Sequence, residues 1–264
     1  MRALSKTAVW PALFFAAALV QASDTKEVHR TVALARDGRV SIETFKGSVT
    51  VSTWDRPEVK IDAVIEPDGT DSDQREKVAE TEVRISGSGS SVTIRSDYGN
   101  THHLHSFLRG LFDWNSGTLP LVRYTIQMPA TARLEIEDHK SDIQVSGLTS
   151  DLKLHTYKGS GRITALDGAA RIETYKGDIR VEFARYSHDS RFETYKGDIE
   201  VSLPRDSRFE LDADAGRRGG LESDFAMITR AGHSRAAHAS GAVNGGGPRM
   251  HMTTYKGTLR VRAT

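Results

Sequence analysis

The 264-residue chain contains no cysteine. This absence excludes disulfide bonds, thiolate catalysis, cysteine-based metal centres and a lipid-modified N-terminal cysteine. It does not exclude an oxidising compartment, because a repeat protein with a continuous core does not depend on disulfides for its stability. The compartment must therefore be inferred from other features of the sequence.

An excess of charge of one sign is also missing. Charged residues make up 27% of the chain, yet the formal net charge is only +1. A chain so evenly balanced creates no overall field that would attract nucleic acid or an anionic membrane surface. We therefore expect no nucleic-acid partner.

Long apolar runs are scarce, and the clearest one lies at the N-terminus. Residues 8–20 are apolar, follow Arg2 and Lys6, and end in Val20-Gln21-Ala22. This pattern predicts a bacterial secretory signal peptide over residues 1–22, cut after Ala22. The alternative is an uncleaved anchor, but the run is shorter than the roughly 20 residues that span a bilayer. We expect an exported protein, periplasmic or associated with the cell envelope, with no transmembrane segment in the mature chain.

The most prominent feature that is present is a repeated phrase, Thr-Tyr-Lys-Gly. It occurs at residues 156–159, 174–177, 194–197 and 254–257, with a near copy at 44–47 and a worn copy, Asp-His-Lys-Ser, at 138–141. The step is 18 residues from Gly159 to Gly177, 20 to Gly197, and 19 to Gly216 in a degenerate copy. Self-similarity at so short a period is typical of a stacked-repeat architecture.

Short segments that alternate apolar and polar residues flank each copy. Ile172 precedes Gly177, for example, and Ile179 and Val181 follow it. Alternation of this kind predicts strands with one buried face. A step of about 19 residues is too short for a strand-helix-strand unit of roughly 30 residues. We therefore predict an all-β, parallel β-solenoid of rungs of 18–20 residues, with residues 23–264 as one repeat domain and a positive φ at each corner glycine.

Several segments depart from the regular pattern. Residues 66–82 predict an exposed loop with one short helix, or a continuous loop, and residues 82–94 predict a hairpin broken at Gly87-Ser88-Gly89. Residues 207–216 predict a degenerate rung that follows residues 191–202, and residues 250–262 predict the rung that closes the stack.

A loop insertion is predicted near residues 97–120. It contains His102, His103 and His105, and its large apolar residues are Phe107, Leu108, Leu111, Phe112 and Trp114. A packed or flexible loop is the ordinary interpretation, while the apolar residues also suit a loop that binds a partner or touches a membrane. The histidine spacing is too loose to predict a metal site.

The order of these features resembles the DUF4097 family. The relevant features are Thr-x-x-Gly-Asp-Ile corners, the glycine run Gly245-Gly246-Gly247-Pro248 and a final rung, over residues 36–264. The resemblance implies a solenoid-like fold in an exported bacterial protein of adhesin type, with no catalytic residues carried over. The family corner is commonly Ser-Gly or Asn-Gly, so the Tyr-Lys pair is a departure. We expect no cofactor and no metal.

The Tyr-Lys pairs are the candidate ligand-binding residues, because stacked rungs would align them in columns. They are Tyr157, Lys158, Tyr175, Lys176, Tyr195, Lys196, Tyr255 and Lys256. One interpretation is structural, an aromatic edge with solvated lysines. The other is a strip that binds an acidic or sugar-rich polymer, such as an envelope polysaccharide. Asp178 and Asp198 are expected to offset the repulsion between neighbouring lysines.

Catalysis is the third class of function. Asp178 and Asp198 could form the carboxylate pair of a polysaccharide-active enzyme, but they recur with the repeat, whereas an active site usually interrupts one. The sequence has no nucleophile elbow, phosphate-binding loop or dinucleotide fingerprint. We therefore predict a non-catalytic binding or structural scaffold. The alternative is an accessory protein of an envelope complex or regulatory system, which binds a protein partner through the insertion.

Overall fold

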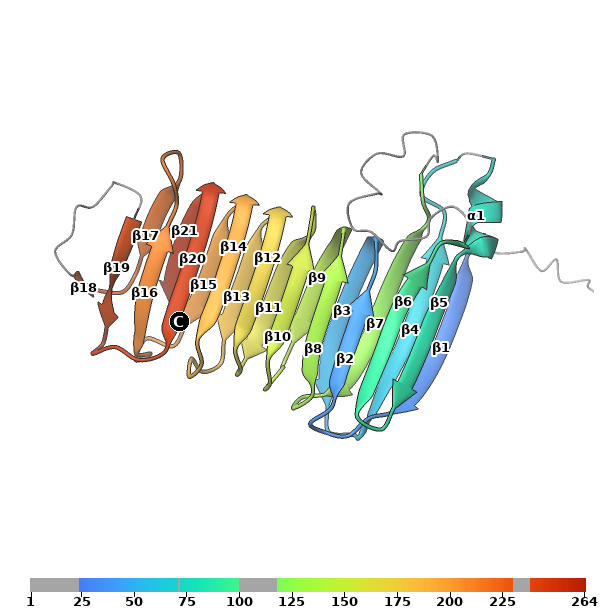
Figure 1. Cartoon of the computed structure of the whole chain (residues 1–264), viewed down its shortest axis with the longest axis horizontal. Helices are drawn as coiled ribbons and strands as arrows, with labels where there is room; N and C mark the ends of the chain where they lie inside the picture. Colours follow the sequence, from blue (N-terminus) through green and yellow to red (C-terminus); the bar gives the residue numbers. More distant parts are fainter. Residues whose placement is uncertain (1–23, 71, 100–117, 230–237) are drawn as a thin grey trace, which may run out of the picture.

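The computed structural model describes residues 24–70, 72–99, 118–229 and 238–264 (Figure 1). The predicted signal peptide and the apolar residues of the predicted insertion, from Phe107 to Trp114, lie outside these ranges. Within the described residues the chain forms strands and one short helix, α1 (Gln74–Glu80). The prediction of an all-β protein is confirmed, as is the short helix expected between residues 66 and 82.

The described strands form two sheets, which lie as layers along the length of the molecule (Figure 1). The ten-stranded sheet has the order β1 (Lys26–Ala33), β4 (Glu58–Glu66), β7 (Leu121–Pro129), β3 (Lys46–Trp54), β9 (Lys140–Ser146), β11 (Ser160–Leu166), β13 (Ile179–Phe183), β15 (Ile199–Leu203), β21 (Thr258–Ala263) and β17 (Gly220–Ser223). The eleven-stranded sheet has the order β18 (Met227–Thr229), β19 (His238–Val243), β16 (Phe209–Asp214), β20 (Arg249–Lys256), β14 (Ser190–Lys196), β12 (Ala170–Lys176), β10 (Leu152–Thr156), β8 (Arg133–Asp138), β2 (Arg39–Glu43), β6 (Ser91–Asp97) and β5 (Glu82–Ser88).

The core lies between the two sheets, because alternate residues of each strand point inward. In the eleven-stranded sheet Leu154 is paired in register with Ile136 on one side and Ile172 on the other, and Ile172 is paired with Phe192. All four side chains are buried. Because the register places like positions side by side, these residues form a continuous apolar column through successive rungs. Burial of one such side chain stabilises the fold by about 1.5–3 kcal/mol.

The strands are parallel in the middle of the molecule and antiparallel at its ends. β8, β10, β12, β14 and β20 pair in parallel, and so do their counterparts in the other sheet. In contrast, β1, β4 and β7 pair antiparallel at one end, and β16, β19 and β18 do so at the other. The predicted hairpin is confirmed as β5–β6, also antiparallel. The prediction of a parallel stack therefore holds for the central rungs and fails where the chain reverses between neighbouring strands near the ends.

The spatial order of the rungs differs from their order in the chain. β20 and β21 lie between β14–β15 and β16–β17 (Figure 1), so residues 250–262 do not close the stack and residues 207–216 do not follow residues 191–202. The phrase at residues 254–257 matches the phrase of β14 position for position, with Lys196 paired to Lys256. β16 lacks that phrase, and it pairs with β20 on one edge and with β19 on the other.

The corner glycines are required for two different reasons. Gly177, Gly197 and Gly257 have φ values of 154°, 148° and 152°, which side chains rarely allow, and a Cβ there would lie 1.9–2.1 Å from a carbonyl oxygen of the neighbouring rung. Gly159 lacks a positive φ, contrary to prediction, but its Cβ would lie 2.5 Å from the Ser141 carbonyl oxygen. Close approach between rungs therefore excludes side chains at all four corners.

Candidate functional site

The Thr-Tyr-Lys-Gly corners build a continuous stack of rings along one edge of the two-sheet structure. We call this stack the aromatic ladder; its members are Phe45, His139, Tyr157, Tyr175, Tyr195 and Tyr255. Successive ring centroids lie 4.4, 5.0, 4.9, 4.9 and 5.0 Å apart, and the planes of the tyrosines differ by at most 3°. The ring spacing follows from the spacing of hydrogen-bonded strands, about 4.8 Å.

The ladder is longer than the sequence predicts, and its two ends differ. Phe45 and His139 come from the near copy and the worn copy of the phrase, and Phe45 and Tyr98 make a T-shaped contact with 6.2 Å between ring centroids. At the other end Gly216 lies beside Tyr255, where a Cβ would be 3.2 Å from the Tyr255 carbonyl oxygen. A glycine adjoins the last ring, so the ladder stops there. Gly216 was predicted to be a corner glycine; it has a φ of 65° in the turn between β16 and β17, and it also lies at the end of the aromatic column.

Stacking leaves the edges of the interior rings open to solvent. Tyr175 and Tyr195 are 39% and 38% exposed although both faces of each ring contact a neighbour, and Tyr255, with one covered face, is 51% exposed. The accessible parts of the interior rings are therefore their edges. His139 is half-buried in the stack, and burial, with the nearby Lys158 and Lys140, lowers the pKa of its imidazole, which favours a neutral ring.

A line of ammonium groups accompanies the ladder. We call Lys158, Lys176, Lys196 and Lys256 the lysine row; each Nζ lies 5.3–5.9 Å from the centroid of the tyrosine that precedes it. These distances are in the range of cation–π attraction. Among the described residues, no carboxylate lies within ion-pair distance of any member of the row.

Asp178 and Asp198 do not pair with the lysine row, contrary to prediction. Asp178 accepts a hydrogen bond from the backbone N–H of Asp198 at 2.9 Å, and Asp198 accepts one from the N–H of Thr258 at 2.8 Å and one from Arg260 at 2.6 Å. Burial alone would raise the pKa of Asp198, but the bonds from Arg260 and Thr258 hold it below its ordinary value. These carboxylates connect one rung to the next, and this accounts for their recurrence without catalysis.

Asp138 replaces the buried threonine of the repeated phrase. It accepts hydrogen bonds from the N–H and the hydroxyl of Ser141, at 2.8 and 2.6 Å, and from the hydroxyl of Thr156 at 2.7 Å. Burial raises the pKa of this carboxyl group, although the bonds from Ser141 and Thr156 act in the opposite direction.

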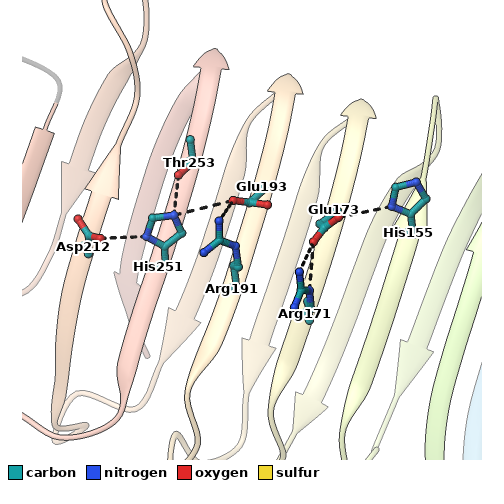
Figure 2. A network of polar contacts seen from close by, with 8 residues as sticks. All are labelled: His155, Arg171, Glu173, Arg191, Glu193, Asp212, His251 and Thr253. Atoms are coloured by element: carbon teal, nitrogen blue, oxygen red, sulfur yellow. Dashed lines mark hydrogen bonds and ion pairs between the residues drawn. The ribbon is translucent and has the colours of Figure 1, made fainter.

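The outer face of the eleven-stranded sheet carries a network of paired charges beside the ladder (Figure 2). Arg171 pairs with Glu173 at 3.0 Å on β12, and Arg191 pairs with Glu193 on β14. His251 lies 2.9 Å from Asp212 across β20 and β16. This network was not predicted from the sequence, although the Arg-x-Glu spacing places both members of a pair on one face of a strand.

One part of this network has the order of groups found in hydrolases. The Thr253 hydroxyl lies 3.0 Å from Nε2 of His251, whose Nδ1 faces Asp212 (Figure 2). Acyl transfer also needs donors for the oxyanion. β20 is paired with β14 on one side and β16 on the other, which commits its N–H groups to strand pairing. This arrangement is therefore better explained as a cross-strand polar contact.

Shallow grooves follow the ladder and the charged face. A groove of about 620 Å³ is lined by Tyr157, Tyr175, Tyr195 and Tyr255 together with side chains such as Glu173 and Asp214. A second, of about 850 Å³, lies over Phe45, His139 and the neighbouring charged residues. The surface beside the ladder is thus hollowed along the direction in which the rungs stack.

A family model described as Toastrack DUF4097 matches residues 90–261. The chain belongs to the DUF4097 family. The match begins later than the resemblance at residues 36–264 suggested, so β2, β3 and Phe45, which lies in the corner between these two strands, are outside the matched part. No curated protein gave a significant match.

Two solved structures are similar to this DUF4097 chain. One is a proposed cell adhesion protein from Clostridium sporogenes, with 9% identity and a TM-score of 0.49, covering 91% of this chain and 100% of its own. The other is a proposed adhesin from Bacteroides fragilis, with 12% identity and a TM-score of 0.45, covering 90% of this chain and 97% of its own.

The structure brings all eight candidate Tyr and Lys residues of the DUF4097 chain together at one edge. The candidate partner-binding residues Phe107, Leu108, Leu111, Phe112 and Trp114 lie outside the described residues, as do His102, His103 and His105. Within the described ranges no group of three or more acidic or histidine side chains could hold a metal ion. No helix in the same ranges is long and apolar enough to cross a bilayer.

Proposed function

We propose that this DUF4097 protein is a non-catalytic β-solenoid scaffold of the bacterial cell envelope, which binds an extended polysaccharide along the aromatic ladder. In this proposal residues 1–22 direct export, and residues 23–264 form one repeat domain that acts in the periplasm or at the envelope. The observation that carries the proposal is the unbroken run of tyrosines and lysines on an accessible edge.

The fold does not require the outward tyrosine and lysine side chains at this surface. The buried columns and corner glycines stack the rungs, and family corners of Ser-Gly or Asn-Gly lack these bulky outward side chains. Aligned ammonium groups repel one another, and like charges on neighbouring strands are destabilising. A repeating surface with a spacing of 4.9–5.0 Å offers the same contact many times to a ligand that itself repeats, so weak contacts add up.

The proposal is tested by replacing Tyr157, Tyr175 and Tyr195 with serine and measuring retention on immobilised capsular polysaccharide and peptidoglycan. We expect retention to be lost while the far-ultraviolet circular dichroism of the strands is kept. A second variant, with phenylalanine at the same positions, preserves the stacked rings and removes only the hydroxyl groups, so it separates ligand contact from damage to the stack. Unchanged retention of the folded serine variant would refute the proposal.

A further inference from the structure

Along this edge of the molecule, some of the described charged side chains have an oppositely charged partner and others do not. On the outer face of the eleven-stranded sheet, Glu135, Glu173 and Glu193 each have a basic partner. Lys153 and Lys46 likewise pair with carboxylates. The lysine row, among the residues that the structure describes, has no such partner, and Lys158 and Lys176 are exposed. The lysine row is therefore a line of positive charges, without ion-pair partners in the described ranges, beside the ladder.

The interior ring faces are not available to a ligand. Each interior tyrosine is covered on both sides by rings at 4.9–5.0 Å. Sugar recognition through aromatic side chains ordinarily places a sugar ring flat on an aromatic face, and among the tyrosines of the ladder only Tyr255 has a face that no other described ring covers. A polymer that runs along the ladder must therefore contact ring edges, tyrosine hydroxyls and ammonium groups. Such contacts recognise acceptors and negative charge.

The lysine row also has a fixed period. Lys176, Lys196 and Lys256 are paired in register on β12, β14 and β20, so one ammonium group is presented per strand, at the strand spacing of about 4.8 Å. An extended chain of pyranose rings advances by a comparable length for each sugar. A polymer with one carboxylate on every sugar can therefore place successive charges opposite successive lysines.

We infer that the polymer bound along the ladder is a linear acidic polysaccharide with one carboxylate per sugar residue. This inference rests on the proposed function and specifies the ligand class at the same surface. The ammonium groups of the lysine row contact the carboxylates, and the tyrosine hydroxyls contact the sugar oxygens. The net charge of +1 gives the rest of the chain no comparable attraction, so binding depends on the row itself.

The experiment measures binding of the full mature chain to polygalacturonate and to the same polymer after complete methyl esterification. Esterification removes the charges and keeps the sugar chain. We expect the esterified polymer to bind at least tenfold more weakly, and binding of polygalacturonate to weaken steeply as salt rises, because salt screens charge contacts. Equal, salt-independent binding of both polymers would overturn the inference and leave the proposed function standing.

Two variants with the same change in net charge locate the contact. One carries Lys158→Gln, Lys176→Gln and Lys196→Gln. The control carries Lys153→Gln, Arg171→Gln and Arg191→Gln, which lie in the same rungs but in the paired network. We expect the first variant to lose at least tenfold in affinity and the control to lose much less. Equal losses would overturn the assignment to the lysine row.

A third polymer tests whether the sugar matters. Poly-L-glutamate carries regularly spaced carboxylates on a peptide backbone. We expect it to bind more weakly than polygalacturonate, because it offers no sugar oxygens to the tyrosine hydroxyls. Equal binding would overturn the assignment to a polysaccharide. Failure of every polymer to bind the chain, together with unaltered behaviour of the tyrosine variants, would instead count against the proposed function.

Discussion

The ring of Tyr195 stacks on the ring of Tyr255, with centroids 5.0 Å apart and planes 3° apart, although a degenerate rung lies between them in the chain. Tyr195 is therefore an interior member of the aromatic ladder, and Tyr255 is its last member. This relationship determines which tyrosines have two ring neighbours, and it gives a direct test of the rung order.

Replacement of Tyr175 by alanine should destabilise the protein more than replacement of Tyr255. Tyr175 contacts two rings and Tyr255 contacts one. A stacked aromatic pair contributes about 0.5–1.5 kcal/mol beyond area burial, so the free energy of unfolding should fall by about that much more for Tyr175→Ala. Urea denaturation of each variant measures the difference.

Tyr195→Ala is the informative comparison in the same series. If the rungs stacked in chain order, the degenerate rung would separate Tyr195 from Tyr255, and Tyr195 would have one ring neighbour instead of two. In the observed order it should behave like Tyr175. A loss of stability for Tyr195→Ala that matches Tyr255→Ala would contradict the position of β20 next to β14.

Gly177→Val should be far more damaging than Lys176→Ala at the adjacent position. Gly177 has φ 154°, and a Cβ would lie 1.9 Å from the Gly159 carbonyl oxygen. Backbone strain of this kind costs on the order of 1–3 kcal/mol, and the steric overlap adds to it. Lys176 is exposed, so its truncation should change stability by about 0.5 kcal/mol or less. Thermal unfolding of both variants would show the contrast, and equal melting temperatures would contradict it.

Asp138 should make stability depend on pH in the direction opposite to most carboxylates. Its folded-state pKa is raised by burial, so the folded state binds the proton more tightly than the unfolded state does. Its favourable contribution is present below the unfolded pKa, about 3.9, and is lost as pH rises through the raised folded pKa. Relative to Asp138→Asn, the wild type should therefore lose stability across that window, as measured by urea denaturation at a series of pH values.

Asp198 provides the matched control for this measurement, because its folded-state pKa is lowered. Its contribution is present above the unfolded pKa and is lost as pH falls through the lowered folded pKa. The difference in free energy of unfolding between the wild type and Asp198→Asn should therefore shrink as pH falls. Relative to Asp138→Asn, the free energy of unfolding of the wild type should instead decrease as pH rises from acid. If both substitutions changed the pH dependence of stability in the same direction, the surroundings described for Asp138 or for Asp198 would be contradicted.

Much of the central architecture was predictable from short-range pattern. The alternation around residues such as Ile172 and Val181 predicts strands with one buried face, and both residues are buried. The recurrence of Tyr175 and Tyr195 at equal positions in their rungs predicts a column of rings, and the column is present. These predictions succeed because a two-residue alternation fixes which side chains point outward, and identical rungs that pair in register place identical residues side by side.

The sequence by itself determined the strands, the glycine corners and the outward Tyr-Lys pairs, because each depends on residues close together in the chain. Only the tertiary structure decided that Phe45 and His139 extend the ladder, that Tyr255 follows Tyr195, and that the glutamates of the outer face are paired while the lysine row is not. Strand edges pair with whichever neighbour matches them in hydrogen bonding and packing. A long segment between two strands, such as residues 224–248 between β17 and β20, which includes β18 and β19, leaves that choice open until the whole core assembles.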